Sequence, residues 1–220
     1  MRWLQIIFAV LVMIVGGNNI MAIEEAPYKV VKKNNKFEIR DYDTYIIAET
    51  SVTGNLEEAG NKAFGKLFKY ISGNNKAREK VAMTSPVTQK ADGEKIKMTA
   101  PVEQQKAKDS WKVSFVMPSS YTMKTIPKPD DSNIILKEIP ARRIAAIRYS
   151  GTWSEKRYLQ HKLKLENWIS TNNLTSAGDV IWARYNPPFT PWFLRRNEVL
   201  IPINSNDKQK TSDKSTKGEI

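Results

Sequence analysis

The chain has 220 residues, which is about one to two domains, and its hydrophobic share of 40% can support a real core. It contains no cysteine and one histidine, which excludes disulfides, thiolate metal sites, cysteine nucleophiles and histidine-rich metal sites. The net charge of +12 attracts anions such as phosphate backbones, anionic lipids or small acidic ligands, without choosing among them.

The first 22 residues have the order of an export signal. Arg2 is their only charge, Trp3–Val15 is almost wholly apolar, and Ala22 offers a cleavage position. This apolar run fits a signal peptide better than a membrane span, and an uncleaved N-terminal membrane anchor is the alternative. We therefore predict a signal peptide at residues 1–22 and a periplasmic or secreted protein without a membrane span after processing.

Strand signals open the mature part at Lys36–Tyr42 and Thr44–Val52. The next stretch, Asn55–Asn75, predicts a helix with glutamates in its first turn, where the helix dipole favours anions. Gly73 is a plausible stop for this helix. Four large apolar residues follow helical spacing and form one stripe: Phe64, Leu67, Phe68 and Ile71.

Two similar phrases follow this helix, KVAMTSPV at Lys80–Val87 and KIKMTAPV at Lys95–Val102. An Asp-Gly pair between them is a hairpin turn signal, so we predict that the phrases form two arms of a hairpin. Their methionines, Met83 and Met98, have the chemistry of thioether metal ligands. The preferred interpretation is that they fill the core between sheet and helix.

After the hairpin phrases the sequence predicts a further strand and then, in the second half, more strands around one helix. The expected elements are strands at Trp111–Met117, Ile134–Glu138 and Arg143–Tyr149, a helix at Glu155–Thr171 with Ser154 as its N-cap, and strands at Asp179–Tyr185 and Glu198–Ile203. Residues 119–133 are expected to form a loop. Residues 204–220 are almost entirely polar and predict a disordered tail.

The two predicted helices belong to a repeated unit. YISGNN at Tyr70–Asn75 returns as WISTNN at Trp168–Asn173, which is 98 residues later, and the preceding strand returns at the same offset. A shared offset across strand and helix indicates a duplicated half-domain. Residues 23–203 are therefore predicted to be one α+β domain with two equivalent halves, a barrel-like antiparallel or mixed sheet with two helices packed on it.

His161 is the candidate imidazole ligand. Helical phase places it beside Tyr158, Leu165 and Trp168, so the preferred interpretation is a histidine at the edge of the buried face, bonded to a neighbour. The sequence contains no glycine-rich phosphate loop, zinc pattern or nucleic-acid motif, and it shows no activated nucleophile. We therefore assign no catalytic or metal-ligating residue and expect no nucleic-acid partner.

The stretch Tyr185–Ile203, YNPPFTPWFLRRNEVLIPI, is the most distinctive of the chain. Three prolines stiffen a loop whose large apolar side chains are too many for an ordinary exposed turn: Phe189, Trp192, Phe193 and Leu194. Two interpretations stay open. These side chains either fold back onto the core or line a pocket for a flat apolar ligand.

From about Pro27 to Ile203 the sequence resembles the SOUL/haem-binding-protein family. The resemblance is carried by VAMTSPV at Val81–Val87, MTAPV at Met98–Val102, and YNPP at Tyr185–Pro188 leading to RRNEV at Arg195–Val199. It implies a pseudo-two-fold, distorted antiparallel β-barrel with two helices packed on it. It also implies binding of haem or a related tetrapyrrole in an apolar surface groove between the first helix and the loop before the final strand.

Carried over residue by residue, the resemblance implies the following tetrapyrrole-binding residues: Phe64, Leu67, Phe68, Lys69, Lys112, Phe189, Trp192 and Phe193. Lys69 and Lys112 match basic positions thought to face the porphyrin propionates. Asn61 and Thr190 stand where haem-binding members can have Arg and Lys, so half of that basic set is missing.

The hypothesis that follows is a monomeric, non-catalytic carrier, buffer or sensor of haem or another tetrapyrrole, bound without an axial protein ligand. One alternative is an enzyme that acts on an open-chain tetrapyrrole, a bilin. The other is an interaction protein whose groove is empty. A bilin product assay and a ligand-binding screen distinguish the three.

Overall fold

The computed structural model describes residues 23–77 and 93–204; the predicted signal peptide, the first hairpin phrase with Met83 and all but the first residue of the predicted tail lie outside them. The helices are α2 (Leu56–Ile71), α3 (Glu155–Thr171) and the short 3-10 helix η1 (Trp192–Leu194). The strands are β1 (Tyr28–Asn34), β2 (Phe37–Tyr42), β3 (Tyr45–Val52), β4 (Asn75–Lys76), β5 (Val102–Lys106), β6 (Trp111–Val116), β7 (Lys128–Pro129), β8 (Ile134–Ile139), β9 (Arg142–Tyr149), β10 (Ile181–Arg184) and β11 (Asn197–Pro202).

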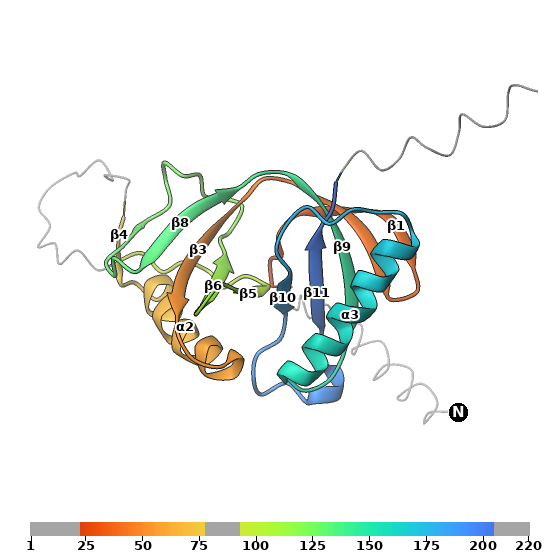
Figure 1. Ribbon diagram of the computed structural model, residues 1–220. Coiled ribbons are helices and arrows are strands. Elements are labelled where there is room, and N and C mark those ends of the chain that lie inside the picture. Colours follow the sequence, from red (N-terminus) through yellow and green to blue (C-terminus); the bar gives the residue numbers. More distant parts are fainter. Residues whose placement is uncertain (1–22, 78–92, 205–220) are drawn as a thin grey trace, which may run out of the picture.

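One antiparallel sheet of nine strands dominates the described part and curls into a half-barrel (Figure 1). Its order is β1-β2-β9-β11-β10-β5-β6-β3-β8, while β4 and β7 pair separately. This confirms the predicted α+β fold, a distorted barrel-like sheet with two helices packed on it.

The strand order has a two-fold character. β3 leads through α2 to β5 and β6, β9 leads through α3 to β10 and β11, and the two groups meet where β5 pairs with β10. β2 precedes β3 but pairs with β9, whereas β8 precedes β9 but pairs with β3. The topology therefore matches the predicted pseudo-two-fold arrangement. Duplication of the sequence itself stays a prediction.

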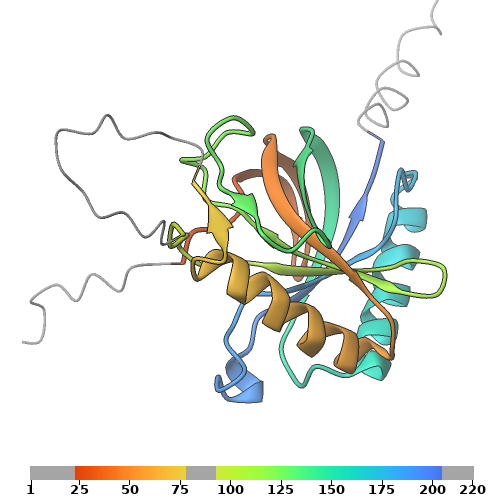
Figure 2. The same ribbon diagram turned by 90° about the vertical axis from the view of Figure 1, so that its left-hand side faces the viewer.

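Both long helices cover the same face of the sheet (Figures 1 and 2). The apolar cluster beneath them joins both helices to strands β2, β3, β6, β8, β9, β10 and β11. Its members include Leu67, Tyr70, Val113, Phe115, Tyr158, Leu165, Val199 and Ile201. A second cluster on the opposite face contains no residue of either helix. Because side chains alternate across a strand, the two clusters separate the residues of each strand into two sets.

The helices begin where the sequence predicts. The Asn55 side chain accepts hydrogen bonds from the backbone N–H groups of Glu57 and Glu58, at 3.1 and 2.9 Å, and the Ser154 hydroxyl accepts one from Arg157. These caps satisfy donors that a helix leaves without a partner at its N-terminus.

Two sequence expectations differ from the structure. β1 is a lysine-rich edge strand, exposed along most of its length, and it lacks the alternation that marks a half-buried strand. The second predicted hairpin arm is not a strand over Lys95–Thr99, and β5 begins only at Val102. Its Ile96 N–H instead donates to the carbonyl of Ile71 at the end of α2.

Candidate functional site

A cavity of about 360 Å³ lies between α2 and the loop that follows β10. Residues from α2, the segment before β5, the loop before α3 and the proline-rich loop line it: Ile23, Gly60, Asn61, Phe64, Met98, Thr99, Ala100, Val102, Trp153, Arg184, Tyr185, Asn186, Pro187, Pro188 and Phe189. The lining is mainly apolar, and the volume falls in the range of roughly 300–1,000 Å³ typical of small-molecule sites.

Two of the predicted site residues meet in this cavity. Phe64 enters from α2; its ring stacks on Phe68, with 5.9 Å between centroids, and contacts Phe115 edge-on at 5.3 Å. Phe189 enters from the proline-rich loop and is 86% exposed. One aromatic side of the cavity is therefore fixed by the core, and the other projects into solvent.

The structure places the other predicted residues elsewhere. Leu67 is fully buried in the core under α2, so it cannot contact a surface ligand without displacement. Lys69 is exposed in the last turn of α2, outside the cavity lining. Lys112 alternates with Trp111 and Val113, whose side chains pack under α2, so Lys112 lies on the opposite face of the sheet.

Trp192 and Phe193 belong to η1, which projects from the molecule below the sheet in Figures 1 and 2. They are 57% and 58% exposed, and their rings contact each other at 5.6 Å. Of the four large apolar side chains of this loop, Phe189 therefore lines the cavity, whereas Trp192, Phe193 and Leu194 neither fold onto the core nor line the cavity. Together Phe189, Trp192, Phe193 and Leu194 form an exposed patch at its edge, here called the loop patch.

The RRNEV phrase holds the loop in place. The Arg195 guanidinium donates to the carbonyl oxygens of Thr190 and Pro188 and stacks over Trp153 at 4.3 Å. The Asn197 side chain accepts a hydrogen bond from the Trp153 indole at 2.9 Å. Two residues of the RRNEV phrase, Arg195 and Asn197, thus contact Trp153 and support the part of the cavity wall that this tryptophan forms.

A buried ionic network continues from this phrase on the opposite face of the sheet. Glu198 is fully buried and accepts hydrogen bonds from Arg40 at 2.6 and 3.0 Å, from Arg196 and from the hydroxyl of Tyr185. Its two cations keep the pKa of Glu198 below the ordinary value even though burial alone raises it. Arg196 also reaches Glu25, so the network ties the start of the domain to β11.

His161 and Met98, whose side chains could in principle bind a metal, occupy different environments. His161 stacks on Tyr149 with 3.8 Å between ring centroids, and its Nδ1 lies 2.7 Å from the Arg157 carbonyl oxygen. This confirms the predicted histidine at a buried edge, bonded to a neighbour. Met98 is 41% exposed and lines the cavity, so the interpretation of Met98 as a core residue is wrong. Within the described residues Met98 lies outside the strands, in the segment that precedes β5.

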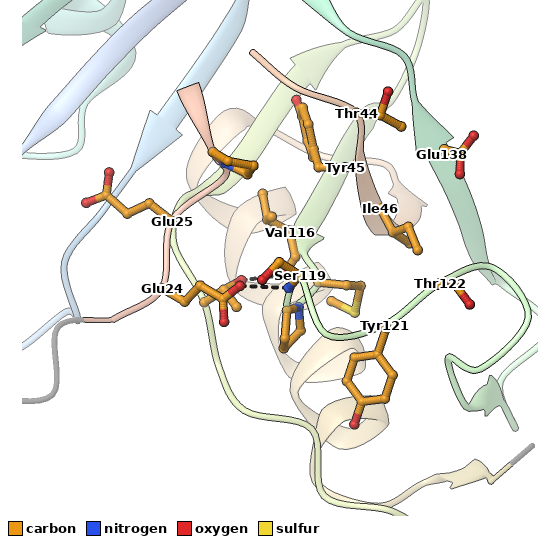
Figure 3. Close-up of a pocket in the computed structure, with 14 residues that line it drawn as sticks. Glu24, Glu25, Thr44, Tyr45, Ile46, Val116, Ser119, Tyr121, Thr122 and Glu138 are labelled. Carbon is orange, nitrogen blue, oxygen red and sulfur yellow. Dashed lines mark hydrogen bonds between the residues drawn. The ribbon is translucent and has the colours of Figure 1, made fainter. Parts of the chain in front are cut away.

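A second, smaller cavity of about 170 Å³ has a different character (Figure 3). It is lined by Glu24, Glu25 and Glu138 among other residues, and the Glu24 carboxylate accepts a hydrogen bond from the Ser119 backbone. None of the predicted site residues lines it. Three carboxylates make it unsuited to an anionic ligand.

Comparison with known proteins gives the class. The sequence profile of the SOUL heme-binding protein family matches residues 23–202, and the chain belongs to this family. Relatives named heme-binding protein 1 from Xenopus tropicalis and Mus musculus are 28% and 27% identical over 188 and 190 residues. The alignments cover 83% and 82% of this chain and 94% and 93% of those proteins.

Solved structures with little sequence similarity share the fold. The EcmrR C-terminal domain superposes with a TM-score of 0.55 at 11% identity, covering 80% of this chain and 98% of that one. A hydrolase from Listeria innocua gives a TM-score of 0.50 at 12% identity, covering 79% and 94%. At such identities the likeness concerns the fold alone.

Besides Phe64 and Phe189, the cavity lining includes residues that the sequence did not predict as site residues, among them Gly60, Met98, Trp153 and Arg184. Gly60 lies in a segment that was predicted as a helix, and Met98 lies in one that was predicted as a hairpin arm, so neither was considered as part of a pocket wall. Trp153 is far from the proline-rich loop in the sequence, and Arg184 is the last residue of β10, just before that loop. The tertiary fold brings both residues to the same cavity. The one available signal was the glycine in the middle of a helix, which costs stability and therefore indicates close packing.

Proposed function

We propose that the chain binds haem or a related tetrapyrrole in the cavity between α2 and the proline-rich loop. The observation that carries this proposal is the position of the cavity. It lies between the first helix and the loop before the final strand, the two elements that the family resemblance implies, and Phe64 and Phe189 line it. Membership of the SOUL family supports haem as the ligand class.

The lining suits a flat apolar macrocycle. Phe64, Phe189, Pro187 and Pro188 offer aromatic and ring surfaces, and the loop patch extends the apolar surface beyond the cavity edge. Burial of about 300 Å² of apolar surface contributes roughly 7–8 kcal/mol before the cost of association. Because micromolar binding requires about 8 kcal/mol, weak to moderate affinity is expected without an iron–protein bond.

We further propose that the iron has no axial protein ligand. His161 belongs to α3 and stacks on Tyr149 of β9, outside the cavity lining. Tyr185 does line the cavity, but its hydroxyl donates to Glu198, and burial raises its pKa well above the ordinary value, which disfavours a phenolate. Met98 is the remaining ligand-type side chain in the described lining. Met98→Leu keeps the apolar volume, so an unchanged Soret maximum is the expected result.

The proposed role is that of a monomeric, non-catalytic carrier, buffer or sensor in the periplasm or outside the cell. Within the described residues no helix has the length and apolarity needed to cross a membrane. The alternative of an enzyme acting on a bilin is tested by incubating the chain with the bilin and analysing products by mass spectrometry. Recovery of chemically unchanged bilin is the expected result.

A haem titration followed by absorbance tests the site. Phe189→Ala removes an 86% exposed ring with no role in the core, so loss of its burial against the ligand should lower affinity by about ten- to hundredfold. Leu163→Ala on α3 is the matched control, because it removes an exposed apolar side chain that is outside the cavity lining. Equal affinity in the two variants would place the ligand elsewhere.

A further inference from the structure

One arginine in the cavity wall has an unusual environment. Arg184 ends β10 and lines the cavity. Its guanidinium carbon lies 5.2 Å from the Trp153 ring centre and 5.0 Å from that of Trp182. Within residues 23–77 and 93–204 it makes a single side-chain hydrogen bond, in which it donates to Gln104, and its Nε–H is buried without an acceptor.

The surroundings hold this cation in position. Gln104 is fully buried, and its own amide donates to the Leu56 carbonyl, so the acceptor for Arg184 is fixed. On the other side α2 carries Gly60, and a Cβ at this position would lie 2.5 Å from a guanidinium nitrogen. Thus a glycine in the middle of α2 makes the room that Arg184 occupies.

What the environment lacks is a counter-charge. No carboxylate within the described residues lies at ion-pair distance from Arg184, in contrast to Arg40, Arg143 and Arg196. Glu57, on the exposed first turn of α2, acts on it only through longer-range attraction, and burial lowers the pKa of Arg184 to about 10, which leaves it charged at neutral pH. Stacking on two indoles offsets part of the cost of a partly buried cation, but its Nε–H remains without an acceptor.

From these observations we infer that Arg184 receives an ionised carboxylate of the ligand inside the cavity, and that the chain selects tetrapyrroles with a free propionate-type side chain over their esters. This inference rests on the proposed tetrapyrrole site. It assigns the charged contact to the wall beside Trp153, whereas Lys69 and Lys112 lie outside the lining. A guanidinium presents five N–H donors in a planar fork, which suits two carboxylate oxygens.

The inference is tested with haem and haem dimethyl ester, titrated against the full chain in the same mild detergent and followed by quenching of tryptophan fluorescence. Wild type should bind haem about 10- to 100-fold more tightly than the ester, the size of a charge-assisted hydrogen bond in a partly dry site. Arg184→Gln should lose this preference while keeping the affinity for the ester. Arg148→Gln, which removes the same charge from an exposed position on β9, is the matched control.

A second variant guards against a folding defect in Arg184→Gln. Gly60→Ala removes no charge and favours the helix, but its Cβ displaces the end of the Arg184 side chain. It should therefore keep the fold by circular dichroism and lose the preference for haem over the ester.

The outcomes are distinguishable. If wild type binds neither compound, the proposed function is wrong. If it binds both, and the folded variants keep the wild-type ratio, the tetrapyrrole site stands and the role of Arg184 is overturned.

Discussion

At the scale of single residues, the buried ions of this chain separate into two kinds. Arg40 and Glu198 are almost fully buried and satisfy each other through two hydrogen bonds, so their charges have no capacity left for a ligand. Arg184 has no such partner within the described residues. Burial alone therefore does not identify a charged group that is available to a ligand. The hydrogen bonds and ion pairs that the group already makes must also be considered.

The Arg40–Glu198 pair predicts a large stability effect. Arg40→Met leaves Glu198 buried with Arg196 as its remaining cation, and loss of one partner of a buried pair costs about 3–5 kcal/mol. Urea unfolding followed by circular dichroism measures this. Lys33→Met breaks the exposed ion pair with Glu38 and should change stability by less than about 1 kcal/mol. Similar losses in both variants would contradict the structural role of Glu198.

His161 predicts a pH effect on stability. Burial, together with Lys164, Lys36 and Arg157 nearby, lowers its pKa below the ordinary value of about 6.5. The unfolded chain therefore binds a proton first as pH falls, so the contribution of neutral His161 is complete above about pH 6.5 and is lost as pH falls toward the folded-state pKa. His161→Phe keeps a flat ring against Tyr149 and cannot titrate.

The measurement is urea unfolding of both proteins at several pH values between about 7.5 and 5.5. Wild type should lose more stability across this range than His161→Phe. Parallel curves would show that the histidine is solvated in the native state. In haem titrations the same variant should keep the wild-type Soret spectrum, because the histidine lies outside the cavity lining.

At the scale of elements, the loop between β10 and β11 depends on Arg195. This guanidinium bridges two loop carbonyls and stacks on Trp153, which is itself part of the cavity wall. Arg195→Ala should therefore loosen the loop, lower the haem affinity by about tenfold and change the melting temperature little, since the loop patch adds nothing to the core.

Hydrogen exchange of residues 186–195 measures the loosening directly. Arg195→Lys should resemble Arg195→Ala, because an ammonium group cannot bridge two carbonyls with the fork geometry of a guanidinium. Arg148→Ala supplies the control for loss of a positive charge on the surface. Unchanged exchange in Arg195→Ala would show that the prolines alone hold the loop.

The elements also show what the sequence could and could not predict. α2 and α3 were predictable because their caps and apolar spacing are local properties of the chain. The cavity was predictable as far as the family resemblance names two elements, and Phe64 and Phe189 do meet there. The remaining wall depends on the pairing of β10 with β5, which brings Arg184 next to Gln104 and is not a local property. Lys112 lies outside the cavity lining, because side chains alternate along β6 and place it on the face opposite Trp111 and Val113.

At the scale of the whole molecule, net charge affects the encounter with a ligand, whereas the cavity determines how the ligand is held. The net charge of +12 favours encounter with anionic ligands over the whole surface, but exposed lysines are screened and contribute little to a bound state. Lys69→Ala should therefore change the free energy of haem binding by less than about 1 kcal/mol. It should not make haem binding more dependent on salt than it is in wild type. Titration at two salt concentrations checks this, and a tenfold loss would place a propionate at the end of α2 and not at Arg184.

The last prediction concerns the start of the folded domain. The family match begins at residue 23, and bonds to the body begin immediately afterwards: Glu24 accepts from the Ser119 backbone, Glu25 pairs with Arg196, and Ala26 is buried. Removal of residues 1–22 would therefore take away none of these contacts. We expect the exported protein to begin at Ile23, because the preceding segment has the basic, apolar and small-residue order of a signal peptide. Intact-mass measurement of protein purified from the native envelope decides the matter. A mass that includes residues 1–22 would favour the N-terminal anchor, and a start beyond Glu25 would break the ion pair with Arg196.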